Sequence, residues 1–319
     1  MLYRDQIGET QNPPPYSFPG VKINSFRLKA DLNKLQELCD RVLNVGDLEQ
    51  RGFEFRPIFP FVDLEILHYP EMLYAYFPVG CSISQNECYV RLFVMKYLDV
   101  GGLLVPDGEV AVFCPLLLVS NTWSAFAGRD VLGFPKLYGI FDPFSEADPF
   151  TTVSTEVFTA IGVGVTAQTK PVVTIEPAAG KAARIPDKDK KWPWGHIDID
   201  DIHPDHQALV RSVDPTALFF ESVTMKQFRD PTLPINACYQ AILQSVTFVD
   251  AIGEFEPLPA VRIKINDYAT LKLAESLGIA PGVWLKPMSQ YHLECSFFFG
   301  DTVPVFENQH SWWEWWWWF

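Results

Sequence analysis

Apolar residues alternate with polar ones, or run together, along most of the chain between about residues 53 and 118. The segments FVDLEILHY, MLYAYFPV, CYVRLFVMKYL and VAVFCPLLLV are rich in β-branched and aromatic residues, and proline and glycine separate them. This pattern predicts antiparallel strands with little helix between them. The same texture returns at 151–177, near 216–228 and 238–249, and near 291–299. The chain is therefore predicted to be mainly β.

Three short segments have helical spacing instead. Apolar residues recur every three to four positions over 32–43, directly after Asp31, whose side chain is of a type that caps helix N-termini. Residues 121–132 start with cap-forming residues and stop before Gly133, and 267–277 form a further predicted helix. Together with the strands, these helices predict an α+β fold: one large, mostly antiparallel β domain with a few packed helices.

The whole chain, 1–319, is predicted to form one domain, because the strand texture continues on both sides of every polar segment. Residues 1–20 are polar and proline-rich and predict an extended arm, while the charged residues 177–206 predict a surface insertion. The tail, 307–319, includes SWWEWWWWF. We expect it to be buried at a subunit contact, which favours a homo-oligomer. A foot on a membrane surface and a plug over a cavity are the alternatives.

Composition narrows the class of protein further. Of the 319 residues, 48% are hydrophobic and 20% charged, as in globular domains. Twenty-five basic against 39 acidic residues give a formal net charge of −14, which repels phosphate backbones, so we expect no nucleic-acid partner. The six cysteines are scattered without a CxxC pair and predict reduced thiols in the cytoplasm. No apolar run approaches the length of a membrane span.

Two kinds of chemistry receive little support from the sequence. One group combines residue types that bind metals within a short stretch: His196, Asp198, Asp200, Asp201, His203 and His206. Their spacing matches no common metal site and they lie in the polar insertion, so we predict a solvated loop and no metal. Motifs of phosphate-binding loops, dinucleotide folds, serine hydrolases and zinc proteases do not occur in the sequence.

The segment GRDVLGFPK ends at Lys136, just after a predicted helix and an apolar Gly-Phe-Pro turn. Apolar surroundings desolvate an amine, and this disfavours its ammonium form. A neutral lysine amine can attack a carbonyl carbon and form a Schiff base. Taken alone, the local sequence favours a structural lysine, whose stem packs on an apolar strand end while its charge reaches water.

The same segment resembles the signature of the acetoacetate decarboxylase family, in which the Schiff-base lysine follows a Gly-Arg pair at this nine-residue spacing. Further segments resemble the family in the same order: FRLKADLNKLQELCD, ISQNECYVRLF, VTMKQFRDPTLPINACYQAILQSVTFVD and VRIKINDYATLKLAESLGI. The resemblance extends from roughly residue 18 to 300. It implies a cone-shaped antiparallel β-barrel with an internal apolar cavity, usually in an oligomer.

The family decarboxylates a β-keto acid through an imine, without a metal or an organic cofactor. The resemblance therefore implies a Schiff-base-forming lyase that acts on a β-keto acid or a related apolar keto compound, with no cofactor. By position, Lys136 is the imine-forming amine, and Glu87 is the carboxylate that orients the substrate or moves a proton. Arg129 and Asp130 are expected to support the site from the helix. The expected pocket residues are Tyr76, Phe134 and Leu137.

Three departures from the family pattern bear on the substrate. The second lysine that usually follows the first is Leu137 here. The family's substrate-binding arginine falls near Val21, and a second family carboxylate falls near Tyr76. The missing cations argue against acetoacetate itself. Three alternatives stay open. The first is aldol condensation with dehydration on the same imine, and the second is a non-catalytic barrel that binds an apolar ligand. The third is an assembly protein whose tryptophan-rich tail is the functional part.

Overall fold

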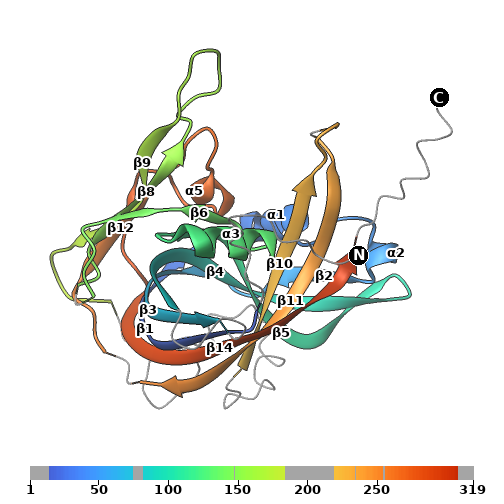
Figure 1. The fold of residues 1–319 in the computed structure, drawn as a ribbon, viewed down its shortest axis with the longest axis horizontal. Helices are drawn as coiled ribbons and strands as arrows, with labels where there is room; N and C mark the ends of the chain where they lie inside the picture. Colours follow the sequence, from blue (N-terminus) through green and yellow to red (C-terminus); the bar gives the residue numbers. More distant parts are fainter. Residues whose placement is uncertain are drawn as a thin grey trace.

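The computed structural model describes residues 14–74, 82–146, 148–183, 219–233, 235–253 and 256–307, and the predicted mainly β fold is confirmed there (Figure 1). The strands are β1 (Tyr16–Lys29), β2 (Phe53–Pro57), β3 (Phe61–Tyr74), β4 (Ser82–Val100), β5 (Leu103–Val119), β6 (Lys136–Tyr138), β7 (Ile140–Asp142), β8 (Thr151–Val157), β9 (Gln168–Pro177), β10 (Phe219–Arg229), β11 (Ala237–Ile252), β12 (Val261–Ile265), β13 (Trp284–Leu285) and β14 (Ser289–Glu307). The helices are α1 (Leu32–Val42), α2 (Leu48–Arg51), α3 (Thr122–Asp130) and α5 (Leu273–Ser276).

The larger sheet closes into a ring of paired strands. Its order is β2-β4-β3-β1-β14-β11-β10-β5-β6, and β4 also pairs with β5, so the strands from β4 round to β5 enclose a central space (Figure 1). Most pairs are antiparallel as predicted. The short pairs of β5 with β6 and with β10 are parallel and are the exceptions among the described strand pairs. A smaller sheet, in the order β13-β12-β9-β8-β7, lies beside the ring.

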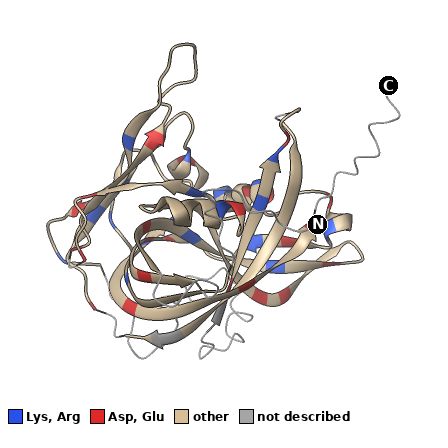
Figure 2. Cartoon of the chain, in the orientation of Figure 1, with Lys and Arg blue, Asp and Glu red and all other residues tan. Residues whose placement is uncertain are grey.

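Along the central stretch of β4 both faces of the strand are largely buried, and they carry different residues. Side chains alternate between the two faces of a strand. On β4, Cys88, Val90, Leu92 and Val94 belong to the main hydrophobic core, which also includes residues of α1 and the smaller sheet. The intervening positions of β4 face the interior of the ring. Acidic and basic residues are interspersed along the strands (Figure 2).

Three helices form at the predicted places, one of them shorter than predicted, and the single turn of α2 was not predicted. Asp31 caps α1 by accepting from two backbone N–H groups, and Asn121 caps α3 in the same way. The predicted helix over 267–277 is reduced to the single turn of α5. There the Asp267 carboxylate accepts from the backbone N–H groups of Ala274 and Glu275 at 2.7 and 2.8 Å, so it fixes the start of the helix well inside the predicted range.

Two further segments differ from their prediction. β1 begins at Tyr16, so the end of the predicted arm is strand, with Tyr16 and Phe18 buried. The strand texture of 151–177 is interrupted by an exposed turn between β8 and β9 that contains Val163. The histidine and aspartate cluster, nearly all of the insertion at 177–206, and residues 308–319 of the tryptophan-rich tail lie outside the described residues. No described helix is long and apolar enough to cross a membrane.

Candidate active site

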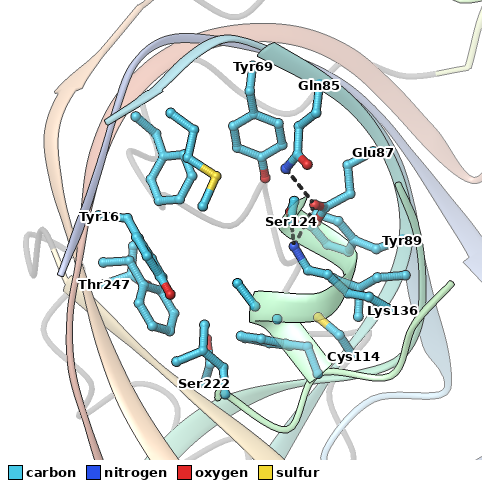
Figure 3. Close-up of a pocket in the computed structure, with 18 of the residues that line it drawn as sticks. Tyr16, Tyr69, Gln85, Glu87, Tyr89, Cys114, Ser124, Lys136, Ser222 and Thr247 are labelled. Atoms are coloured by element: carbon cyan, nitrogen blue, oxygen red, sulfur yellow. Dashed lines mark hydrogen bonds and ion pairs between the residues drawn. The ribbon is translucent and has the colours of Figure 1, made fainter. Parts of the chain in front are cut away.

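The ring encloses a cavity that is closed on one side by α3 (Figure 3). It contains about 100 Å³ of space that the centre of a water molecule can occupy, which is room for several waters or a small organic ligand. Most of its wall is aromatic or aliphatic: Tyr16, Phe18, Tyr69, Met72, Leu132, Phe134, Phe297 and Phe299. The charged residues that line it are Glu87, Arg91 and Lys136.

Lys136 enters this cavity because a tight turn connects α3 to β6. Gly133 in that turn has φ +74°, and a Cβ there would lie 2.8 Å from the backbone nitrogen of Lys226. Lys136 then pairs with Leu117 of β5 and is 9% exposed. Its methylenes run across Gly128 of α3, where a Cβ would lie 2.5 Å from Lys136 Cδ and 2.8 Å from Cε. Glycine at position 128 therefore makes room for the lysine stem.

The lysine amine lies between a carboxylate and a hydroxyl. Lys136 Nζ donates to Glu87 Oε2 at 3.2 Å and to Ser124 Oγ at 3.0 Å (Figure 3). Glu87 is 3% exposed and comes from β4, opposite Val119 of β5. The sheet thus brings together two residues that are far apart in the sequence. An amine and a carboxylate at this distance can exchange a proton.

The inward face of β4 carries polar residues at every second position: Gln85, Glu87, Tyr89 and Arg91, all of which line the cavity. Gln85 Nε2 donates to Glu87 Oε2 at 3.2 Å, so the oxygen that meets Lys136 is also held by an amide. The amide orientation follows from this contact, since the opposite orientation would place two acceptors against each other.

Two arginines and two carboxylates form a buried network beside the cavity. Arg27 donates to the two oxygens of Asp63 at 2.8 and 3.0 Å, and Arg91 Nη2 lies 3.3 Å from Asp63 Oδ2 and 2.8 Å from Glu65 Oε1. Burial alone would raise the pKa of Asp63, but the Arg27 guanidinium, with Arg91, holds it below its usual value. Burial raises the pKa of Glu65.

The structure brings some of the predicted site residues together and leaves others apart. Lys136 and Glu87 are in contact, and Phe134 lines the cavity. Leu137 points the other way and packs against the main core. On α3, Arg129 is exposed and Asp130 is partly buried, and neither lines the cavity. Tyr76 lies outside the described residues.

Several residues of the cavity were not predicted: Tyr69, Gln85, Arg91 and Ser124. Gln85 and Arg91 lie in ISQNECYVRLF, where polar side chains alternate in phase with Glu87. Once Glu87 is placed inside the ring, this phase places Gln85 and Arg91 inside as well. Ser124 lies one helical turn before Gly128, in contact with the lysine. Tyr69 carried no comparable signal, because tyrosine is an ordinary residue of strand packing.

Comparison with known proteins gives a likeness in structure alone. No family model and no curated protein sequence matches the chain. Acetoacetate decarboxylase from Legionella pneumophila subsp. pneumophila str. Philadelphia 1 superposes with a TM-score of 0.55 at 13% identity, over 94% of this chain and 90% of that one. An acetoacetate decarboxylase-like enzyme from Sphingomonas wittichii RW1 has a TM-score of 0.52 at 11% identity, over 92% and 94%. The resemblance is thus confirmed in the fold: the chain folds like the acetoacetate decarboxylase-like enzymes.

Proposed function

We propose that the protein is a Schiff-base-forming lyase of the acetoacetate decarboxylase type, which acts on a β-keto acid or a related apolar keto compound. The observation that carries this proposal is the Lys136 amine, buried in a mainly apolar cavity with Glu87 Oε2 at 3.2 Å. The fold likeness and the closed ring of strands support the cone-shaped barrel that the resemblance implies.

In this proposal Glu87 first accepts a proton from Lys136. The neutral amine attacks the substrate carbonyl carbon, and the former carbonyl oxygen leaves as water, with proton transfer through Glu87. Ser124 and Gly128 fix the amine and its stem, so the nucleophile is held in position before substrate enters. The apolar wall excludes water from the iminium that results.

The iminium withdraws electrons from the substrate. In a β-keto acid, the bond between the α-carbon and the carboxylate breaks, carbon dioxide leaves, and the electron pair forms an enamine. A proton then adds to the α-carbon, and water hydrolyses the iminium, which releases the ketone and regenerates the amine. Every proton that moves comes from water or from the Lys136–Glu87 pair, so the cycle needs no oxidant or reductant.

Borohydride trapping tests the proposal. Wild-type protein is incubated with acetoacetate, pyruvate and a longer β-keto acid, reduced, digested and mapped by mass spectrometry. We expect an adduct on Lys136 with at least one ketone and none in Lys136→Ala. The matched control is Lys226, a half-buried lysine outside the cavity whose pKa is lowered by burial. Lys226→Met should keep the full adduct.

An adduct on Lys226 or on exposed lysines alone, in folded protein, would contradict the proposal. So would full turnover of any substrate by Lys136→Ala, because the imine chemistry depends on that amine. No adduct with any ketone would favour the non-catalytic barrel that binds an apolar ligand.

A further inference from the structure

The charged groups inside the ring already balance one another. Arg27 and Arg91 share the carboxylates of Asp63 and Glu65, through contacts of 2.8 to 3.3 Å. All four side chains are buried. Arg91 is the arginine that lines the cavity, and its Nη2 already contacts both carboxylates. The protein's own carboxylates therefore already compensate the positive charge of Arg91.

The remaining cation of the cavity wall is paired as well. Lys136 is matched by Glu87 at 3.2 Å. Arg51, the other buried cation of the described chain, lies at the end of α2 and donates to backbone carbonyls outside the cavity. A ligand carboxylate would therefore add one uncompensated negative charge to this buried space, which is unfavourable.

The cavity does offer a neutral hydrogen-bond donor. Tyr69 lies on β3, opposite Gln85, and is 5% exposed. Its hydroxyl makes no hydrogen bond to another described residue, and Figure 3 shows it directed into the cavity on the side of Gln85 and Glu87. Burial, and next the charge of Glu87, raise the pKa of Tyr69 well above its usual value, so the hydroxyl keeps its proton. The same negative field opposes a ligand anion there.

On the basis of the proposed function, we propose that the cavity takes an uncharged keto compound with a second oxygen, and that Tyr69 donates a hydrogen bond to this oxygen. An uncharged ligand preserves the charge balance at every step. The ammonium of Lys136 and the carboxylate of Glu87 become an iminium and a carboxylate, while one water leaves. The ring interior is then neutral before and after the imine forms.

This ligand class also fits a carbon–carbon cleavage without carbon dioxide. In a β-hydroxy ketone, the iminium on Lys136 draws electrons while Glu87 accepts the hydroxyl proton. The bond between the α- and β-carbons breaks, the β-carbon leaves as an aldehyde, and the electron pair forms the enamine. Protonation of the enamine carbon and hydrolysis by water then release the ketone, so atoms and electrons balance.

Three methyl ketones of similar size test the inference: acetoacetate, 4-hydroxy-2-butanone and 2-pentanone. They share the reacting carbonyl and differ in the end group, which is an anion, a hydroxyl and a methyl group. The measured quantity is the rate at which Lys136 becomes modified under cyanoborohydride at neutral pH, counting every Lys136 adduct. We expect 4-hydroxy-2-butanone to react about three- to tenfold faster than 2-pentanone. Acetoacetate should react about tenfold slower than 2-pentanone, or slower still.

Each result has a distinct meaning. If acetoacetate modifies Lys136 faster than both uncharged ketones, the uncharged ligand class is wrong while the imine chemistry stands. If no ketone modifies Lys136, the proposed function itself fails. If 4-hydroxy-2-butanone and 2-pentanone react equally fast, the cavity does not recognise a second oxygen and the role of Tyr69 is wrong.

Tyr69→Phe isolates the hydroxyl, because it removes one oxygen and leaves the ring. The ratio of the 4-hydroxy-2-butanone rate to the 2-pentanone rate should fall to about one. The matched control is Tyr268→Phe, whose hydroxyl donates to the backbone oxygen of Pro171 on the surface, and which should keep the wild-type ratio. An unchanged ratio in folded Tyr69→Phe would contradict the assignment of Tyr69.

Discussion

Two ionic groups lie inside the same ring of strands and are built differently. In the arginine network, Arg27 holds Asp63 through two hydrogen bonds, and Arg91 adds a third contact. In the reactive pair, Lys136 holds Glu87 through one contact of 3.2 Å and shares its amine with a hydroxyl. Guanidinium groups stay protonated, whereas an amine can release its proton. The comparison favours a structural role for the first group, and it supports the chemical role that we propose for the second.

The largest effect is expected from breaking the arginine network. Asp63→Ala would leave two buried guanidinium groups with a single carboxylate, Glu65, and should lower the free energy of unfolding by about 3–5 kcal/mol. Chemical denaturation measures this change in the free energy of unfolding. The control is Glu176→Ala, which removes the surface partner of Arg262 and should change stability by no more than about 1 kcal/mol. If both variants lose a similar free energy of unfolding, the buried network is no more important for stability than an exposed ion pair.

The reactive pair should show the opposite behaviour, with a loss of chemistry and little loss of fold. Glu87→Gln keeps the side-chain shape but cannot accept the Lys136 proton. We expect the rate of borohydride trapping to fall about a hundredfold, in the range of general acid–base catalysis. Trapping reactions that are stopped at fixed times and analysed by peptide mapping measure this rate. Glu176→Gln on the surface should trap at the wild-type rate, and an unimpaired Glu87→Gln would rule out Glu87 as the proton acceptor.

Gly128→Ala sharpens the comparison by moving the amine without changing any charge. The new methyl group would lie 2.5 Å from Lys136 Cδ, and a flexible stem can yield where a backbone cannot. We expect the melting temperature to stay near that of the wild type, because alanine favours helix, while trapping slows about tenfold. Gly162→Ala in the exposed turn after β8 is the control. Equal trapping rates in the two variants would show that the stem is not held by α3.

The smallest effect should come from Ser124→Ala, which removes one of the two acceptors of the Lys136 amine. A single hydrogen bond is worth about 0.5–1.5 kcal/mol, so the trapping rate should change about three- to tenfold. Glu87 is then the remaining acceptor of the Lys136 amine. In the Glu87→Gln background we therefore expect Ser124→Ala to leave the trapping rate unchanged. Additive effects of the two substitutions would mean that Ser124 and Glu87 act on Lys136 independently.

The sequence predicted the strands well because alternation is a local property, and it located Lys136 and Glu87 through the resemblance. It did not predict that the polar face of β4 lies inside. Alternation states that Glu87 and Arg91 share a face, but only closure of the ring decides which face lines the cavity. The shortened α5 had a similar cause, since the capping carboxylate of Asp267 precedes the helix by several residues. Tyr69 could be identified only from the cavity itself.

The ring closes at a seam between β10 and β5, and this strand pair is much shorter than the neighbouring pair of β4 and β5. β10 and β5 meet in parallel over the short register from Glu221 opposite Ala111 to Val223 opposite Phe113, whereas the hairpin of β4 and β5 pairs along most of its length. This register offers few backbone hydrogen bonds to offset the loop-closure entropy of joining segments distant in the chain, so we expect the seam to form late in folding. Ser222 of β10 lines the cavity. We therefore expect the chemical environment of Lys136 to be completed late in folding, so that its reactivity would report on that stage.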